Sequence, residues 1–344
     1  MAWATPHHTK GEVDRAGRSL VSTYVSFPDL ADALTVIGNW RSSHSFPLNT
    51  FQVGLRSKAR QVDNDALVAQ RIKRLSSIEA KLLRFPKMNL SQMQDIGGCR
   101  AVVKNVASVR QLADLHRQSL FKHKLLRSDD YLTSPQTSGY RGIHLIYRYF
   151  SDRNDAYNGL QVEIQLRSLL QHAWATAVET VGTFLKQALK SSQGHAEWLR
   201  FFALMGSALA IRERTSMVPN TPTSRTELLA ELRKSARDLD VERRLQAYGD
   251  ALRTLEEPSA SDAHYFLMAL DPKADTITIR GYSKGQLELA TKQYMDVERS
   301  LDAASGAEAV LVSVESVSAL KRAYPNYFLD TRAFLSAVQH ALAE

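Results

Sequence analysis

Hydrophobic and polar positions follow a helical period in the first part of the chain. In residues 27–40, "FPDLADALTVIGNW", apolar side chains recur every three or four positions, and the proline in "SFPLNT" ends the pattern. We therefore expect residues 1–60 to form an N-terminal helical brace that covers the rest of the chain.

The period changes between residues 61 and 192, where short strands alternate with helices. Strand candidates rich in Val, Ile and Tyr are "ALVAQRIK", "IGGCRAVV", "KHKLLRSDDYL", "GIHLIYRYF" and "LQVEIQLR". Helical spacing appears in "SSIEAKLL", in "VASVRQLADLHRQSL" and in a long stretch from Ser168. This order predicts an α+β domain with a mixed sheet of about five strands flanked by helices.

Two further segments follow this domain. Residues 193–257 have a helical pattern interrupted by "MVPNTPTSRTE", whose Pro, Thr and Asn content is typical of a loop. Residues 258–344 predict a small α+β module: a hairpin from "AHYFLMAL" and "DTITIRGY", a helix near 284–303, the strand "AVLVSV" and a final helix. We interpret the aromatics of "YPNYF" as core or turn residues. Position alone suggests a regulatory or partner-binding role for the module.

Composition narrows the class of protein. No run approaches the roughly 18 apolar residues of a membrane span, and the N-terminus lacks the pattern of a secretory signal, so we expect a soluble cytoplasmic protein without a membrane partner. Cys99 is the single cysteine, which excludes an internal disulfide and a cysteine-based zinc site. The formal charge is +8, and residues 51–90 hold nine Lys or Arg against three acidic residues. This excess of positive charge favours phosphorylated nucleotides or RNA as partners. The alternative is a basic surface that is simply solvated.

A basic cluster marks the first candidate site. If "LVAQRIK" is a strand, Arg71 and Lys73 point to the same side. Ser76 and Glu79 then have the spacing of a capping box, which predicts a helix start whose free amides attract phosphate. A solvated helix with a basic face is the alternative. The candidate polyphosphate ligands are Arg71, Lys73, Ser77 and Lys81.

Two carboxylates mark the second candidate site. Asp95 stands at the entry to an apolar strand, next to two glycines that leave room for a close approach, and a carboxylate there suits Mg²⁺. An aspartate that ends a loop is the other reading. In "VEIQLRS", Glu163, Gln165 and Arg167 alternate with apolar residues, as on the wet side of an edge strand or the floor of an active site. The apolar helix that follows must pack on the sheet, and Asp95 and Glu163 would face each other if their strands are neighbours.

The third candidate is a loop. Pro135, Ser138 and Gly139 predict a turn that presents Tyr140 and Arg141 ahead of the next strand. An aromatic ring beside an arginine suits stacking on a nucleobase, although tyrosine is also common at strand edges. His144 is a structural or a functional histidine in the same stretch.

These pieces, in this order, resemble the synthetase domain of the RelA/SpoT alarmone synthetase family, especially its small single-activity members. The matching stretches are "RIKRLSSIEAKL", "DIGGCRAVV", "DYLTSPQTSGYRGIH" and "VEIQLRSLLQHAWA", within residues 50–190. The resemblance implies a nucleotidyltransferase-like fold that transfers the β,γ-pyrophosphate of ATP to a ribose 3′-hydroxyl, typically that of GDP or GTP. The motif of the family's hydrolase domain has no counterpart in the sequence, so the reverse activity is not expected.

The resemblance also implies roles for single residues. Asp95 matches the Mg²⁺ ligand, and Glu163 the carboxylate that assists the metal or removes the proton of the attacking hydroxyl. Tyr140 matches the tyrosine that stacks on the acceptor base. The implied ATP ligands are Arg71, Lys73, Ser77, Lys81 and Arg100, and the further acceptor residues are Arg141, His144, Gln165 and Arg167.

Two positions depart from the family pattern. Many alarmone synthetases have a cation before the Asp-Tyr pair and a lysine after the loop proline, where this chain has Asp129 and Gln136. Such cations would help to hold the 5′-phosphates of GDP or GTP. Alarmone synthesis remains the first expectation. Toxic relatives that modify the 3′-terminal adenosine of tRNA are the second, and an inactive nucleotide-binding regulator is the third. An antitoxin or regulatory partner is a further expectation; the sequence predicts no oligomeric state.

Overall fold

The computed structural model describes residues 3–185, 189, 195–250, 253–256, 263–271, 276–301, 307–314, 316–328 and 330–344. Its strands are β1 Leu67–Ile72, β2 Gly97–Val103, β3 Lys124–Asp130, β4 Ile143–Arg148, β5 Gln161–Ser168, β6 Arg253–Glu256, β7 Tyr265–Asp271, β8 Thr276–Tyr282 and β9 Glu308–Ser313. The longer helices are α1 Lys10–Leu20, α2 Phe27–Ser43, α3 Ser45–Val62, α4 Leu75–Arg84, α5 Val106–Arg117, α6 Leu169–Phe184, α7 Ala196–Glu213, α8 Arg225–Asp238, α9 Val241–Asp250, α10 Leu287–Ser300, α11 Val317–Ala323 and α12 Arg332–Ala343.

All described strands join one mixed sheet, in the order β3-β4-β5-β2-β1-β9-β7-β8-β6. The predicted α+β class is confirmed, and residues 61–192 supply β1 to β5, the five strands expected there. β5 pairs in parallel with β2 and antiparallel with β4, so it lies inside the sheet. The reading of "VEIQLRS" as an exposed edge strand is therefore wrong.

The C-terminal strands extend the same sheet. β9 pairs antiparallel with β1 through Gln70 with Ser313 and Arg71 with Val312, and with β7 on its other side. β7 and β8 form the predicted antiparallel pair. The boundaries at 61–192, 193–257 and 258–344 stay a prediction, although the sheet runs across them without a break.

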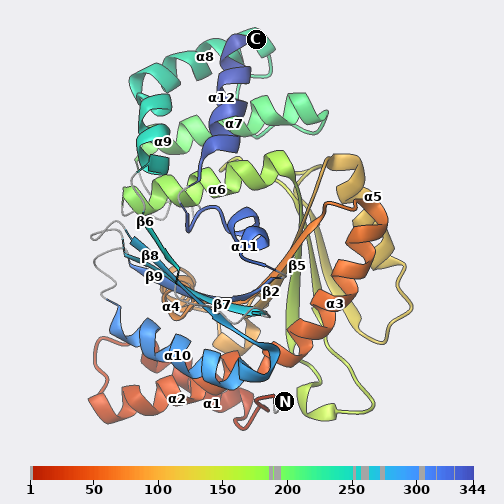
Figure 1. Ribbon diagram of the computed structural model, residues 1–344, viewed down its shortest axis with the longest axis vertical. Helices are drawn as coiled ribbons and strands as arrows, with labels where there is room; N and C mark the ends of the chain where they lie inside the picture. Colours follow the sequence, from red (N-terminus) through yellow and green to blue (C-terminus); the bar gives the residue numbers. More distant parts are fainter. Residues whose placement is uncertain are drawn as a thin grey trace.

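Helices cover both faces of the sheet (Figure 1). α1, α2 and α10 lie on one face, while α6 lies on the other, with α7, α8, α9 and α12 gathered beyond it. α11 lies between α6 and the sheet, close to β1. α6 begins as predicted, because the side chain of Ser168 accepts from the Gln171 amide and that of Gln171 from the Ser168 amide. No helix in the described ranges is long and apolar enough to cross a membrane.

Two local predictions need correction. The helix over residues 27–40 ends at Ser43, just before "SFPLNT" as expected, but Pro47 does not lie in a loop: it lies in the first turn of α3, which begins at Ser45, where an amide has no partner within the helix. The capping box of Ser76 and Glu79 is absent, because α4 begins at Leu75. The amide of Leu75 donates instead to the Glu298 carboxylate of α10, at 2.8 Å.

Candidate functional site

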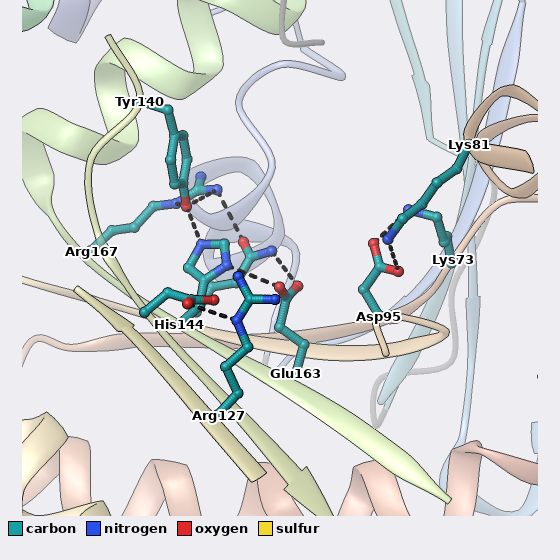
Figure 2. Close-up of polar contacts among 10 residues, drawn as sticks. Lys73, Lys81, Asp95, Arg127, Tyr140, His144, Glu163 and Arg167 are labelled. Atoms are coloured by element: carbon teal, nitrogen blue, oxygen red, sulfur yellow. Dashed lines mark hydrogen bonds and ion pairs between the residues drawn. The ribbon is translucent and has the colours of Figure 1, made fainter. Parts of the chain in front are cut away.

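Asp95 lies between two lysine ammonium groups. Lys73, which follows β1, and Lys81, on α4, reach its two carboxylate oxygens at 2.7 and 2.8 Å (Figure 2). The Lys73 amide donates to the carbonyl of Ile96, which ties the end of β1 to the approach to β2. Burial favours the neutral carboxyl, but the two ammonium groups hold the pKa of Asp95 well below its usual range. Asp95 is therefore ionised at neutral pH, with cations on both sides.

Glu163 is the centre of a second polar cluster, built on β4 and β5. Its Oε1 lies 2.9 Å from His144 Nδ1, and its Oε2 accepts from the Gln165 amide group at 2.6 Å. The Tyr140 hydroxyl lies 2.5 Å from His144 Nε2 (Figure 2). Burial opposes both charges, yet His144 lowers the pKa of Glu163 to about 2. The Tyr140 hydroxyl and Glu163 raise the pKa of His144 to about 9. Both groups are charged at neutral pH.

The register of the sheet relates the two carboxylates. Gly98 pairs with Glu163 across β2 and β5, and Asp95 lies three residues before Gly98. The charge of Asp95 acts on Glu163 and raises its pKa, against the larger effect of His144. A Cβ added at Gly98 would meet nothing within 4 Å, so there is open space beside Glu163. That Asp95 and Glu163 face each other stays a prediction, since Asp95 binds Lys73 and Lys81 while Glu163 binds His144 and Gln165 (Figure 2).

Two tyrosines from the C-terminal module lie against the predicted phosphate cradle. The guanidinium of Arg100 lies 5.2 Å from the ring centre of Tyr324, and the Tyr324 hydroxyl donates to the carbonyl of Gln70 at 3.1 Å. Tyr324 and Tyr327 are each only 1% exposed. Burial opposes the charge of Arg71, but Glu179 of α6 and Tyr327 raise its pKa. The ring of Tyr324 therefore covers the guanidinium of Arg100, and both tyrosines act electrostatically on Arg71.

Some polar groups near Tyr324 and Tyr327 are buried without a hydrogen-bond partner. Among the described residues, Nε of Arg100 and the hydroxyl of Tyr327 are buried without a hydrogen-bond partner. Burial and the nearby Arg167 lower the pKa of Arg100 to about 10. A buried polar group without a partner costs about 1–3 kcal/mol. The tyrosines therefore satisfy the cradle less well than a ligand with phosphate oxygens would.

The remaining predicted residues are placed as follows. Tyr140 is 6% exposed, and the guanidinium of Arg167 lies 5.2 Å from its ring centre, so its role in base stacking stays a prediction that requires the ring to be uncovered. Arg167 also donates to Gln165 at 3.0 Å. Arg141 points elsewhere, since its guanidinium is buried in an ion pair with Glu213 at 2.8 Å. Ser77 lies in the first turn of α4, on the same helix as Lys81.

Sequence reasoning missed several residues that shape the site. Tyr324 and Tyr327 are core residues, as expected of "YPNYF", but their contacts with the cradle were not foreseen. Glu298 accepts from the Leu75 amide and pairs with Arg41, whose Nε donates to the carbonyl of Lys73. The acidic side chains in helical segments carried no signal that would have revealed these distant partners.

The pair of His144 and Glu163 predicts a loss of stability at alkaline pH. The pKa of His144 is about 9 in the folded chain, above its ordinary 6.5. A raised pKa contributes stability that is complete below the unfolded pKa and is lost as the pH rises through the folded one. We expect the Tm to fall between about pH 6.5 and 10, and this part of the fall to vanish in His144→Gln. Thermal unfolding followed by circular dichroism across this range is the measurement; identical profiles for the two proteins would contradict it.

Comparison with known proteins finds similarity in the part of the chain that carries Asp95 and Glu163. Residues 70–183 match the family model described as "Region found in RelA / SpoT proteins". GTP pyrophosphokinase YjbM of Bacillus subtilis is 32% identical over 114 residues, which cover 32% of this chain and 52% of that protein. GTP pyrophosphokinase YwaC of the same organism is 25% identical over 111 residues, covering 31% and 52%. The chain thus spans about half the length of the curated relatives it matches.

Solved structures of similar proteins include two from Bacillus subtilis. Small alarmone synthetase 2 is 18% identical, with a TM-score of 0.44 over 51% of this chain and 93% of that one. Small alarmone synthetase 1 bound to pppGpp is 22% identical, with a TM-score of 0.42 over 49% and 88%.

Proposed function

We propose that the chain is an ATP-dependent pyrophosphokinase, because residues 70–183 match a region found in RelA/SpoT proteins and because the geometry of the site suits this reaction. The observation that carries the proposal is the grouping of two ionised carboxylates beside a set of cations: Glu163 lies on β5, and Asp95 lies two residues before the neighbouring strand β2. Pyrophosphate transfer requires mainly the neutralisation and positioning of phosphate groups, and this site offers both.

In the proposed reaction, the 3′-oxygen of a ribose forms a bond to the β-phosphorus of ATP. The bond from that phosphorus to the bridging oxygen of the α-phosphate breaks, AMP leaves, and the proton of the 3′-hydroxyl passes to water. Lys73 and Lys81 already hold an anion, the carboxylate of Asp95, and are placed to exchange it for phosphate oxygens. Gln165 and His144 hold the carboxylate of Glu163 in a fixed orientation.

The two carboxylates fit a magnesium ion in their donor chemistry. Mg²⁺ prefers one or two protein carboxylates and takes its other ligands from water and substrate phosphates. Asp95 and Glu163 would hold the ion, and it would supply charge neutralisation at the phosphates. Because the pKa of Glu163 is about 2, we assign it to metal binding and to orienting the 3′-hydroxyl rather than to proton removal.

The first candidate acceptor is GDP or GTP, giving (p)ppGpp. The relatives YjbM and YwaC are both GTP pyrophosphokinases, and the open space at Gly98 lies beside Glu163. Tyr140 would stack on the base once it is uncovered.

The second candidate is the 3′-terminal adenosine of tRNA. Asp129, where many relatives have a cation, binds the guanidinium of Arg127 at 2.7 Å and so neutralises it. Asp129 also pairs in register with His144 of the acceptor cluster. The pair leaves no free cation at this position for the 5′-diphosphate or triphosphate of GDP or GTP, which favours the 3′ end of an RNA as acceptor.

We also propose that residues 316–328 act as a built-in inhibitor. The ring of Tyr324 lies on Arg100, Tyr324 and Tyr327 both act electrostatically on Arg71, and the carbonyl of Arg322 lies 3.3 Å from His172 Nε2 of α6. ATP and this segment compete for one place. The C-terminal module is then the chain's own regulatory partner, and a signal that removes it from the cradle would start the reaction.

One labelling experiment tests the function. The full chain, and the same chain with Tyr324→Ala and Tyr327→Ala, is incubated with γ-labelled ATP and Mg²⁺ together with GDP, GTP, ATP or deacylated tRNA. We expect the label to appear on an acceptor, and its identity decides between the two candidates. Label on GDP or GTP supports alarmone synthesis, and label on tRNA alone supports RNA modification. No transfer by either protein would contradict the pyrophosphokinase and leave the nucleotide-binding regulator.

A further inference from the structure

A buried carboxylate outside the matched region joins two parts of the acceptor side. Glu213, in the last turn of α7, accepts from Arg141 at 2.8 Å and from Gln171 at 3.0 Å. The hydroxyl of Ser168 donates to its other oxygen. Arg141 belongs to the loop that presents Tyr140, whereas Ser168 and Gln171 lie where β5 becomes α6. One side chain thus ties the acceptor loop to the end of the strand that carries Glu163.

The backbone of α7 also lies directly on this loop. A Cβ at Gly139, whose φ is +97°, would come within 2.6 Å of the carbonyl oxygen of Phe202. A Cβ at Gly206 would come within 2.8 Å of Gly139 Cα. The amide of Ser216 donates to the carbonyl of Leu132, at the start of the same loop. Loop and helix therefore pack against each other with no room for a side chain between them.

The position of Glu213 is unfavourable for a helix on its own. A negative charge in the last turn of a helix opposes the helix dipole, and burial adds to its cost. The side chains of Glu213 and Arg141 are only 7% and 2% exposed, so each charge depends on the other. Such a pair fixes the relative position of the two elements that it joins.

We propose that Glu213 is a positioning residue of the acceptor site, which holds the Tyr140 loop in register with β5. The proposal rests on the proposed pyrophosphate transfer. Tyr140 contacts His144, and His144 contacts Glu163, so a shift of the loop changes the place where the 3′-hydroxyl meets Glu163. Lys73, Lys81 and Asp95 lie on other elements and have no contact with Glu213 among the bonds of the described residues. Glu213 therefore serves acceptor use and not ATP binding.

The test is Glu213→Gln in the full-length chain, with and without Tyr324→Ala and Tyr327→Ala. Glutamine keeps the size of the side chain but removes the charge that pairs with Arg141. We expect the KM for GDP or deacylated tRNA, whichever accepts, to rise at least about tenfold, while the KM for ATP changes less than about twofold. Glu231→Gln is the matched control, because Glu231 pairs with Arg200 between α8 and α7, at 2.7 Å, away from the loop. Equal changes in both KM values, or none, would overturn the proposal.

Two additions keep the result decisive. Thr215→Val is a milder variant, since it removes only the bond from Arg141 to the Thr215 hydroxyl, and it replaces Glu213→Gln if that chain does not fold. Amide hydrogen exchange of residues 131–142 measures the mobility of the loop and requires no catalysis. Faster exchange in this loop but not in α4, in Glu213→Gln relative to the parent chain, supports the positioning role. If the loop loosens but no acceptor is labelled by any protein, the proposed function fails and the positioning stands. If labelling proceeds with unchanged KM values and exchange, the positioning role is wrong.

Discussion

Replacing Tyr324 and Tyr327 together by alanine is expected to strengthen the apparent binding of ATP about 100-fold. Burying one aromatic side chain stabilises a folded form by about 1.5–3 kcal/mol. If the two rings favour the covered form by about 3 kcal/mol in all, about 1% of molecules are open to ATP. The apparent dissociation constant is raised by the same factor, because only the open form binds. Removing both rings leaves the cations of Arg71 and Arg100 accessible.

Calorimetric titration with a non-hydrolysable ATP analogue measures this effect. Tyr324→Phe with Tyr327→Phe keeps the rings and loses only the hydroxyls, so it should stay close to the wild-type affinity. Phe334→Ala controls for the loss of a buried ring, since Phe334 is 1% exposed and packs on Phe201 and Phe202 of α7 instead of on the cradle. If the folded double alanine variant binds no better than the wild type, the segment does not compete with ATP.

Asp95→Asn and Glu163→Gln are each expected to lower the transfer rate at least about 1,000-fold in the chain whose cradle has been uncovered. Each change keeps the size of the side chain and removes the charge that a magnesium ion and the phosphates need. The fold should survive, because an amide still accepts from Lys73 in the first case and from Gln165 in the second. Initial rates with saturating ATP and acceptor, together with circular dichroism, separate catalysis from folding.

A charge-removing control belongs with these variants. Asp114→Asn breaks an exposed pair with Arg117 within α5, at 3.0 Å, and should leave the rate unchanged. A rate within tenfold of the parent in either Asp95→Asn or Glu163→Gln would show that the reacting groups lie elsewhere.

Strand alternation was enough to predict which side chains of β5 lie together. The period of two in "VEIQLRS" placed Glu163, Gln165 and Arg167 on one side, and the structure shows them linked by hydrogen bonds. The strands of residues 61–192 were predicted for the same reason, since apolar alternation is a local property. Asp95 was found because a carboxylate beside glycines at a strand entry is a recognisable pattern.

The remaining features depend on residues far apart in the chain. Ser76 and Glu79 have the spacing of a cap, yet the helix starts earlier, because Glu298 arrives from α10 to accept from the Leu75 amide. Tyr140 was expected on a loop that presents it, but its ring lies against Trp174 of α6 and beneath Arg167, in packing that no local pattern encodes. The tyrosines of "YPNYF" were correctly placed in the core, but the sequence does not say which groups they contact. These contacts are set by the tertiary structure and not by the local sequence.

The order in which the sheet is built has a consequence for protein synthesis. The matched region ends at residue 183, whereas the strand that extends β1 and the tyrosines that cover the cradle lie after residue 307. At about 5–20 residues per second, a ribosome needs roughly 7–30 s to make the chain between residue 183 and Tyr327. During this interval a nascent chain has its acidic and basic site residues but not the segment that covers them. If residues 316–328 inhibit the site as proposed, the site residues of each chain are synthesised before the segment that covers them, while the chain is still on the ribosome.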